Sequence, residues 1–354
     1  MGGMRIGLLT GGGDCPGLNA VIRAVVLTAH LVHHDETVGF ADGWRGVLDG
    51  DVVDLDVDRV RDIISQGGTI LHTSRTNPFG VEDGPAKVAA NLAKHGVDVL
   101  VAIGGEDTLG AAFKLHETGV RVIGVPKTID NDLSATEVTF GFDTAVEIAT
   151  EAIDRLRTTA ESHHRVIVCE VMGRHAGWIA TYAGIAGGAA DILVPEEPFD
   201  LAEVCDRLRI RHRSGCFSSI VVVSEGAMPA GAEDLEAARR ATSSPSAAVD
   251  QFGHARLGGI GGWLAAEIER RTGYESRVTI LGHIQRGGTP TAFDRVLATR
   301  FGVAAVSAAH AGAFGSMVAL HCGEIVRVPL ADAVGASKRL DLHLYHDVAG
   351  ALRG

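Results

Sequence analysis

The sequence has few cysteines, a shortage of positive charge and no long apolar run, and each of these excludes a class of protein. The 354 residues include five scattered cysteines and no C-x-x-C pair. An odd number of such cysteines argues against a disulfide framework and favours reduced thiols in an intracellular protein. No apolar run reaches the roughly 18 residues that span a bilayer, and the first ten residues have the pattern of a strand, not of a signal peptide. We therefore expect a cytoplasmic protein with no membrane partner.

The balance of charge is acidic. Lysine and arginine number 32 against 44 aspartates and glutamates, which gives a formal net charge of -12. A field of this sign repels a phosphate backbone, so we expect no nucleic-acid partner. An anionic small substrate would need a local group of basic side chains to overcome the overall field.

Short β-rich runs alternate with longer helical patterns, which is typical of an α/β fold with a largely parallel sheet and helices on both faces. The chain length suggests two domains or one large unit. A segment at about 227–256, richer in Ala, Ser, Pro and charge, suggests a helical insertion or lid, to which we assign no role. The expected strands lie at 5–10, 97–103, 120–125, 165–171, 192–194, 219–224 and 277–281, and the expected helices near 18–31, 108–117, 144–158 and 175–186.

Chemically unusual residues follow these strands. Parallel sheets bind ligands beyond the carboxyl ends of their strands, so several such loops suggest a single cleft between two halves of the protein. The loops lie at 11–14, 104–107, 127–132 and 172–174, at Glu225 and at 283–286.

Two of these loops open helices and are rich in glycine. The run Gly11–Asp14 could bring backbone N–H groups to an anion, or could be only a tight turn. The run Gly104–Thr108 carries Glu106 and Asp107, which could hold Mg²⁺ beside a phosphate or could simply favour the helix N-terminus. Residue chemistry alone leaves both alternatives open.

The run Lys127–Asp132 places a cation, a hydroxyl and two acids within six residues of a strand end. An alcohol that accepts a phosphoryl group needs a base for its proton, and an aspartate near metal and substrate can serve. Arginines suit phosphate through paired hydrogen bonds, although each could instead form a surface ion pair. The candidate basic residues are Arg75, Arg165, Arg174, Arg277, Arg286 and His283.

The sequence resembles the 6-phosphofructokinase family from about residue 5 to residue 315. The motifs that carry the resemblance lie at 12–19, at 67–69 with Arg75, and at 126–132, 170–174 and 281–288. The resemblance implies two Rossmann-like three-layer domains with largely parallel sheets and the active site in the cleft between them. We expect residues 1–141 with about 285–335 to bind the phosphoryl donor, and residues 142–284 with about 336–354 to bind fructose 6-phosphate.

The resemblance also implies a role for each matching residue. Asp130 matches the base that deprotonates the 1-hydroxyl of fructose 6-phosphate, Gly13 the contact to the donor phosphate, and Glu106 the acid linked to Mg²⁺. Arg165 and Arg277 match arginines that a neighbouring subunit supplies, which implies a homo-oligomer, either a dimer or a tetramer. The further catalytic positions are Lys127, Asp107, Arg75 and Arg174, and the further substrate positions are Thr128, Ile129, Asp132, Met172, Gly173, Glu225, His283 and Arg286.

Two positions distinguish the phosphoryl donors. Members that use ATP carry glycine where this chain has Asp107, and many also carry glycine in place of Lys127. An aspartate there would occupy the space of the α-phosphate of ATP, whereas diphosphate has no such group. We expect a reversible diphosphate-dependent 6-phosphofructokinase that requires Mg²⁺ and serves glycolysis or gluconeogenesis.

Two alternatives are an ATP-dependent 6-phosphofructokinase and a non-catalytic regulatory protein that binds sugar phosphates. The sequence leaves open the size of the oligomer, the physiological direction and activity on sedoheptulose 7-phosphate. Arg23 and Arg157 match arginines of bacterial effector sites, but Leu27 stands where another arginine is expected. We therefore expect little allosteric response.

Overall fold

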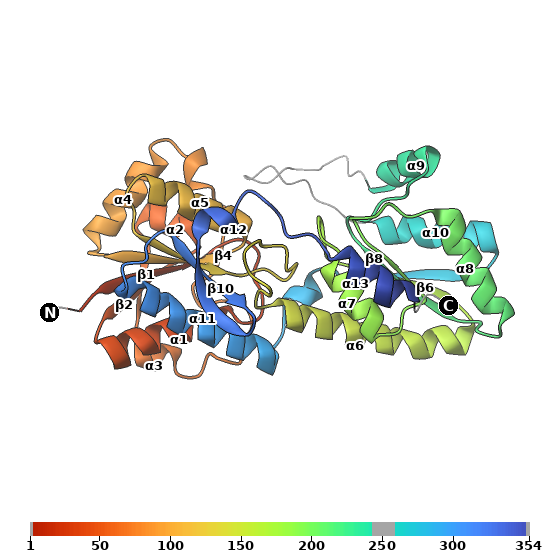
Figure 1. Cartoon of the computed structure of the whole chain (residues 1–354), viewed down its shortest axis with the longest axis horizontal. Helices are drawn as coiled ribbons and strands as arrows, with labels where there is room; N and C mark the ends of the chain where they lie inside the picture. The colour runs from red at the N-terminus through yellow and green to blue at the C-terminus, as the bar shows by residue number, and fades with distance from the viewer. Residues whose placement is uncertain (1–2, 243–258, 352–354) are drawn as a thin grey trace.

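The computed structural model describes residues 3–242 and 259–351 and has two lobes, each built around its own sheet (Figure 1). The first sheet has seven strands in the order β11-β10-β5-β4-β1-β2-β3, and the second has four in the order β7-β8-β6-β9. Helix α6 (Phe142–His163) leads from the first lobe into the second. The fold is therefore α/β, as the sequence predicts.

The first sheet is parallel at its centre and antiparallel at both edges. Strands β1 (Arg5–Thr10), β4 (Val99–Gly104) and β5 (Val122–Pro126) run parallel, and every residue of β4 and β5 is buried. This is the burial expected of strands with helices on both faces. The edge pairs are β2 (Glu36–Phe40) with β3 (Val52–Leu55), and β10 (Ser316–His321) with β11 (Glu324–Pro329).

Helices cover both faces of this sheet (Figure 1). One core packs α1 (Leu18–Thr28) and α11 (Ala292–His310) against the sheet. The opposite core uses α2 (Trp44–Asp49), α4 (Gly84–Lys94), α5 (Glu106–Glu117) and α12 (Leu330–Ala333).

The second sheet is parallel throughout and is likewise covered on both faces. Its strands are β6 (Val166–Val171), β7 (Asp191–Leu193), β8 (Ser219–Ser224) and β9 (Ser276–Ile280). Helices α6 and α7 (Trp178–Ala186) pack on one face with the same core that holds α1 and α11. Helices α8 (Leu201–Arg213), α9 (Ala232–Thr242) and α10 (Ile260–Thr272) pack on the other. One apolar core therefore continues from the first lobe into the second.

The expected elements are present, two of the strands with the expected bounds and the other elements with shifted ends. The helix expected near 18–31 ends at Thr28 and continues as the π-helical turn η1 (Ala29–His33), closed by His34 at φ 59. The segment expected as an insertion holds α9 up to Thr242, and its residues after Thr242 lie outside the described residues. The short elements are α3 (Val57–Val60), η2 (Pro78–Gly80), η3 (Gly282–Arg286), α13 (Leu342–Leu344) and η4 (Tyr345–Gly350).

The chain crosses between the lobes again near its end. Strands β10 and β11 join the first sheet, and the segment after α12 then crosses to the second lobe, where it forms α13 (Figure 1). The expected division of the chain into donor and sugar domains remains a prediction. None of the helices in residues 3–242 and 259–351 is long and apolar enough to cross a membrane.

Candidate active site

The glycine loop after β1 is held from two sides. Gly12, at φ 79, donates from its N–H to the carbonyl of Ser74 (3.2 Å), and its own carbonyl accepts from Thr73 Oγ1 (2.6 Å). A Cβ at Gly11 would collide with Thr108, so the first turn of α5 packs directly against this loop. The loop and the α5 N-terminus therefore form one surface.

Two cations converge on the same loop. The Lys127 ammonium donates to the carbonyl of Gly13, and a Cβ at Gly13 would run into the Arg286 guanidinium. Lys127 is buried at the end of β5, and burial lowers its pKa. A buried lysine and an arginine at a loop with a helix N-terminus favour an anionic ligand.

Asp130 lies three residues after Lys127 in the loop that follows β5. Burial and, next, the charge of Asp132 raise its pKa to about 7, while Arg286 opposes the rise. Among the described residues, its buried Oδ1 accepts no hydrogen bond. The buried Nε of Arg286 likewise donates none within the described part of the chain. A carboxyl group that titrates near neutrality and keeps an uncommitted oxygen can accept a proton from a ligand.

The loop around Asp130 is fixed by its own hydroxyl groups. Thr128 Oγ1 accepts from the N–H of Asp130 (3.1 Å), and Thr139 Oγ1 donates to the carbonyl of Thr128 (2.7 Å). Ile129 is buried between these residues. Burial raises the pKa of Asp132, and a hydrogen bond from Thr128 opposes this rise.

The second lobe contributes the loop after β6. Gly173 has φ 135, and its carbonyl accepts from Ser224 Oγ (2.6 Å) and from the N–H of Gly226 (3.2 Å). Met172 donates from its N–H to Gln285 Oε1 (3.3 Å). The loops after β6, β8 and β9 are thereby held together at one edge of the second sheet.

Charges from both lobes meet at this edge. Burial raises the pKa of Glu225, and Arg174 opposes the rise. Glu225 and Arg174 in turn act on Asp130, the former raising its pKa and the latter lowering it. The carboxylate of the first lobe and the basic residues of the second therefore face a common space.

Other candidate residues border this space with more exposed side chains. Glu106 is exposed and Asp107 half-buried, both in the first turn of α5. Arg75 is exposed and follows Thr73 and Ser74, which hold the glycine loop.

His283 is also exposed, whereas Gln285 and Arg286 from the same turn, η3, lie against the loops described above.

No three His, Cys, Asp or Glu side chains form a ready metal-binding group in the described part of the chain. Mg²⁺ needs only one or two carboxylates, since it keeps several waters and binds substrate phosphate. The carboxylates of Glu106 and Asp107, next to the glycine loop, fit that ligand set.

Arg165 and Arg277 do not reach this space in a single chain. They lie at the start of β6 and β9, whereas the loop Met172–Arg174 follows the end of β6. Six residues of strand span roughly 20 Å. There Arg165 pairs with Glu275 (2.8 Å), to which Arg277 also donates.

Three residues of the site were assigned no individual role from the sequence. Asp14 directly follows the glycine loop and raises the pKa of Lys127; its position after three glycines was an available signal. Gln285 lies between two candidate residues, yet its amide gave no sign that it would face Met172. Lys338 opposes the raised pKa of Asp132 from more than two hundred residues away, and no local motif marks it.

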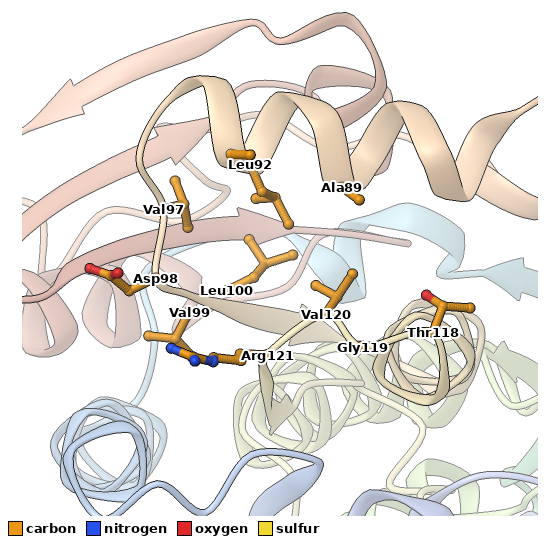
Figure 2. A pocket seen from close by; sticks show the side chains of 11 residues that line it. Ala89, Leu92, Val97, Asp98, Val99, Leu100, Thr118, Gly119, Val120 and Arg121 are labelled. Carbon is orange, nitrogen blue, oxygen red and sulfur yellow. The ribbon is translucent and has the colours of Figure 1, made fainter.

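Among the described residues, two of the cavities lie away from this site. The larger, of about 330 Å³, lies where Ala89 and Leu92 of α4 face Leu100 and Val120 (Figure 2). This is the end of the first sheet opposite the glycine loop. The smaller, of about 210 Å³, lies between β7, α8 and Tyr345. Neither is lined by a candidate residue.

Comparison with known proteins gives one consistent family. Residues 5–309 match the family described as phosphofructokinase. A pyrophosphate–fructose 6-phosphate 1-phosphotransferase of Streptomyces coelicolor is 58% identical over 98% of this chain and 98% of its own. An ATP-dependent 6-phosphofructokinase of Mycobacterium tuberculosis is 54% identical over 98% and 99%.

A solved structure with the same fold is the pyrophosphate-dependent phosphofructokinase from Marinobacter aquaeolei. It superposes with a TM-score of 0.81 at 24% identity and covers 96% of this chain and 86% of that one.

Proposed function

The chain belongs to the phosphofructokinase family and is a phosphotransferase, and we propose that it transfers a phosphoryl group from diphosphate to the 1-hydroxyl of fructose 6-phosphate. The products are fructose 1,6-bisphosphate and phosphate. The observation that carries this proposal is the convergence of Lys127 and Arg286 on Gly13 beside the uncommitted oxygen of Asp130. Two charge-neutralising groups and one base are the parts that phosphoryl transfer needs.

Asp130 acts as the base. A carboxylate with a pKa of about 7 takes a proton far better than an ordinary aspartate, yet is still largely ionised just above neutrality. As the 1-hydroxyl attacks phosphorus, its proton passes to the free oxygen of Asp130. In the reverse direction the same group returns the proton.

The cations neutralise the donor. Diphosphate lies against the glycine loop at Gly13, where Lys127, Arg75 and the N-terminus of α5 oppose the charge that develops on the leaving phosphate. Arg174 and Arg286 face the transferring group from the second lobe. When bound, Mg²⁺ supplies further positive charge, and Glu106 is the residue that we assign to hold it.

The sugar phosphate lies on the loops of the second lobe. We assign its contacts to Met172, Gly173, Glu225 and His283, with Thr128, Ile129 and Asp132 on the first-lobe side. The fixed carbonyl of Gly173 and the Gln285 bridge support this assignment, because they hold three loops in register. The donor therefore lies on the first lobe, and the acceptor lies on the second lobe, with Thr128, Ile129 and Asp132 completing its site.

A homo-oligomer accounts for the position of Arg165 and Arg277. Both lie at the far end of β6 and β9, and β9 is an edge strand whose Val278 and Ile280 are 39% and 52% exposed, with Ile284 at 59% just after it. An apolar edge flanked by arginines suits a second copy of the chain. We propose that each copy supplies these two arginines to its neighbour.

An ATP-dependent 6-phosphofructokinase is the second candidate, because relatives so named are nearly as similar as those that use pyrophosphate. The test is the initial rate with fructose 6-phosphate and Mg²⁺, comparing diphosphate with ATP at equal concentration. We expect turnover with diphosphate. Turnover with ATP alone would reject our assignment of Asp107 and Lys127, and binding of fructose 6-phosphate without turnover on either donor would indicate a regulatory protein.

A further inference from the structure

The segment that returns to the second lobe after α12 pairs on its way with the loop that follows Asp130. We call residues 336–340 the C-terminal crossover. Its Lys338 donates from the backbone N–H to the carbonyl of Asp132 (2.7 Å), Ser337 forms a bridge with Leu133, and Ser134 Oγ donates to the carbonyl of Ala336 (2.5 Å). The crossover therefore lies along the loop of the base like a short extra strand.

The side chain of Lys338 adds a second hold on this loop. Its ammonium donates to Asn131 Oδ1 (2.9 Å) and to the carbonyls of Thr136 (3.0 Å) and Glu137 (2.8 Å). An ammonium group has three N–H donors, so all of them are used on this loop. Asn131, the residue between the two aspartates, has φ 50 and also accepts from the N–H of Thr139 (3.1 Å).

Holding Asn131 matters because its backbone is in a region that only a few residue types tolerate. A left-handed non-glycine residue persists where its surroundings fix it. Lys338 and Thr139 fix it through the same oxygen. Asp130 precedes this residue directly, so its position depends on the same contacts.

The crossover is also attached to the second lobe. Trp178 Nε1 donates to the carbonyl of Lys338 (3.3 Å), and the Lys338 ammonium lies 5.4 Å from the centre of the Trp178 ring. Glu196 accepts from the N–H of Leu340 (2.9 Å) and from that of Gly177 (3.1 Å). Gly177 and Trp178 open α7 and follow the loop Met172–Arg174 within a few residues.

We propose that Lys338 is a positioning residue that sets Asp130 against the sugar-phosphate loop of the second lobe. The inference rests on the proposed function for the meaning of Asp130, but not for the contacts. Lys338 touches the loop of the base on one side and Trp178 on the other. The glycine loop of the donor is held separately, by Thr73 and Ser74. Loss of Lys338 should therefore misplace the base and leave the donor site intact.

The test compares Lys338→Met with Arg339→Met, since Arg339 is the exposed neighbour in the same crossover. We expect Lys338→Met to lower kcat by about tenfold or more, because a small misplacement of a reacting group is costly. The KM for diphosphate should stay within about twofold. Arg339→Met should behave as the wild type, and Lys338→Arg should recover part of kcat.

Hydrogen exchange supplies a readout that needs no reaction. Lys338→Met should increase exchange in residues 131–139 and leave residues 11–14 as in the wild type. Unchanged exchange in 131–139, or a kcat equal to that of Arg339→Met, would overturn the proposal. If Lys338→Met does not fold, Trp178→Phe removes the N–H donor to Lys338 and shrinks the ring beside its ammonium, and a normal kcat with normal exchange would overturn the proposal equally. A wild-type chain with no turnover on either donor would instead reject the proposed function, and the exchange result would still decide the role of Lys338.

Discussion

The guanidinium of Arg286 lies against Gly13, so a residue that follows the last strand of the second lobe touches the first loop of the chain. These residues are more than 270 positions apart in the sequence and follow strands of different sheets. Arg286 also lowers the pKa of Asp130. One arginine thus links the proposed donor loop, the base and the second lobe.

A methyl group at position 13 should lower activity while leaving stability nearly unchanged. A Cβ in Gly13→Ala would occupy the place of the Arg286 guanidinium, whose flexible end can move at little cost in stability. We expect a melting temperature within about two degrees of the wild type and a loss of kcat/KM of about tenfold or more. Gly110→Ala, on open space in α5, is the matched control and should keep full activity. Equal activity of the two variants would reject a role for the Gly13–Arg286 contact.

The pH dependence of turnover should report Asp130. Because its pKa is raised to about 7, the base is protonated and inactive below that pH and becomes ionised above it. We expect kcat/KM to rise as the pH increases through about 7, and Asp130→Asn to remove nearly all turnover while binding of fructose 6-phosphate persists. A rate profile that is flat between roughly pH 5.5 and 8 would contradict this role.

Donor choice should depend on the volume of the side chain at position 107. Asp107→Gly should permit turnover with ATP, at a cost of about 1 kcal/mol in helix stability. Asp107→Asn keeps the volume and removes the charge. ATP activity in the glycine variant alone would show that the exclusion is steric, and ATP activity in both would show that it is electrostatic. No ATP activity in either variant would reject position 107 as the donor switch.

Two inactive variants should complement each other if Arg165 acts across a subunit interface. Asp130→Asn and Arg165→Ala are each expected to be inactive alone. In a mixed dimer one site receives an intact base and an intact arginine, so co-refolded variants should recover about a quarter of wild-type activity. No recovery on mixing, measured against refolded wild type, would place Arg165 outside the neighbouring site.

Asp294 should make the stability of the protein depend on pH. It is buried between α6 and α11 and accepts from the N–H (2.8 Å) and Oγ1 (2.5 Å) of Thr144. Burial raises its pKa to about 6, above the value of about 3.8 in an unfolded chain, so the folded state favours the neutral form. Stability from this group is therefore lost as the pH rises from about 4 through about 6.

Asp294→Asn, which stays neutral, should gain about 1–3 kcal/mol relative to the wild type at pH 8, and the gain should shrink at pH 4.5. Urea unfolding at the two pH values measures this, with the exposed Asp154→Asn on α6 as the control. A gain that is the same at both pH values would show that Asp294 does not titrate between them.

The sequence predicted the buried strands well but did not reveal β10 and β11, which come late in the chain. Ser219–Ser224 is β8 with the expected bounds, because a strand buried on both faces has a local apolar signature. Strands β10 and β11 were missed, because their place depends on the pairing of Ser316 with Ile123. A contact between such distant residues leaves no periodic trace in either segment.

The same distinction applies to the site. Loops at strand ends gather by topology alone, so Gly13, Lys127 and Asp130 could be expected near one another. Lys338 could not, since it reaches Asn131 only through the return of the chain after α12. The position of Arg165 at the start of β6, away from the cleft, follows from the direction of the strand, and its proposed use requires a second copy that a single sequence does not display.

The late arrival of β10 has a consequence for synthesis on the ribosome. Strand β5 carries the loop of the base, but its outer edge pairs with β10, which emerges only after all four strands of the second sheet have been made. Until then, β5 presents unpaired backbone groups, which are prone to pairing with other chains. The nascent chain therefore passes through a long period in which its first sheet is incomplete, and slow elongation through residues 130–315 should favour aggregation over assembly.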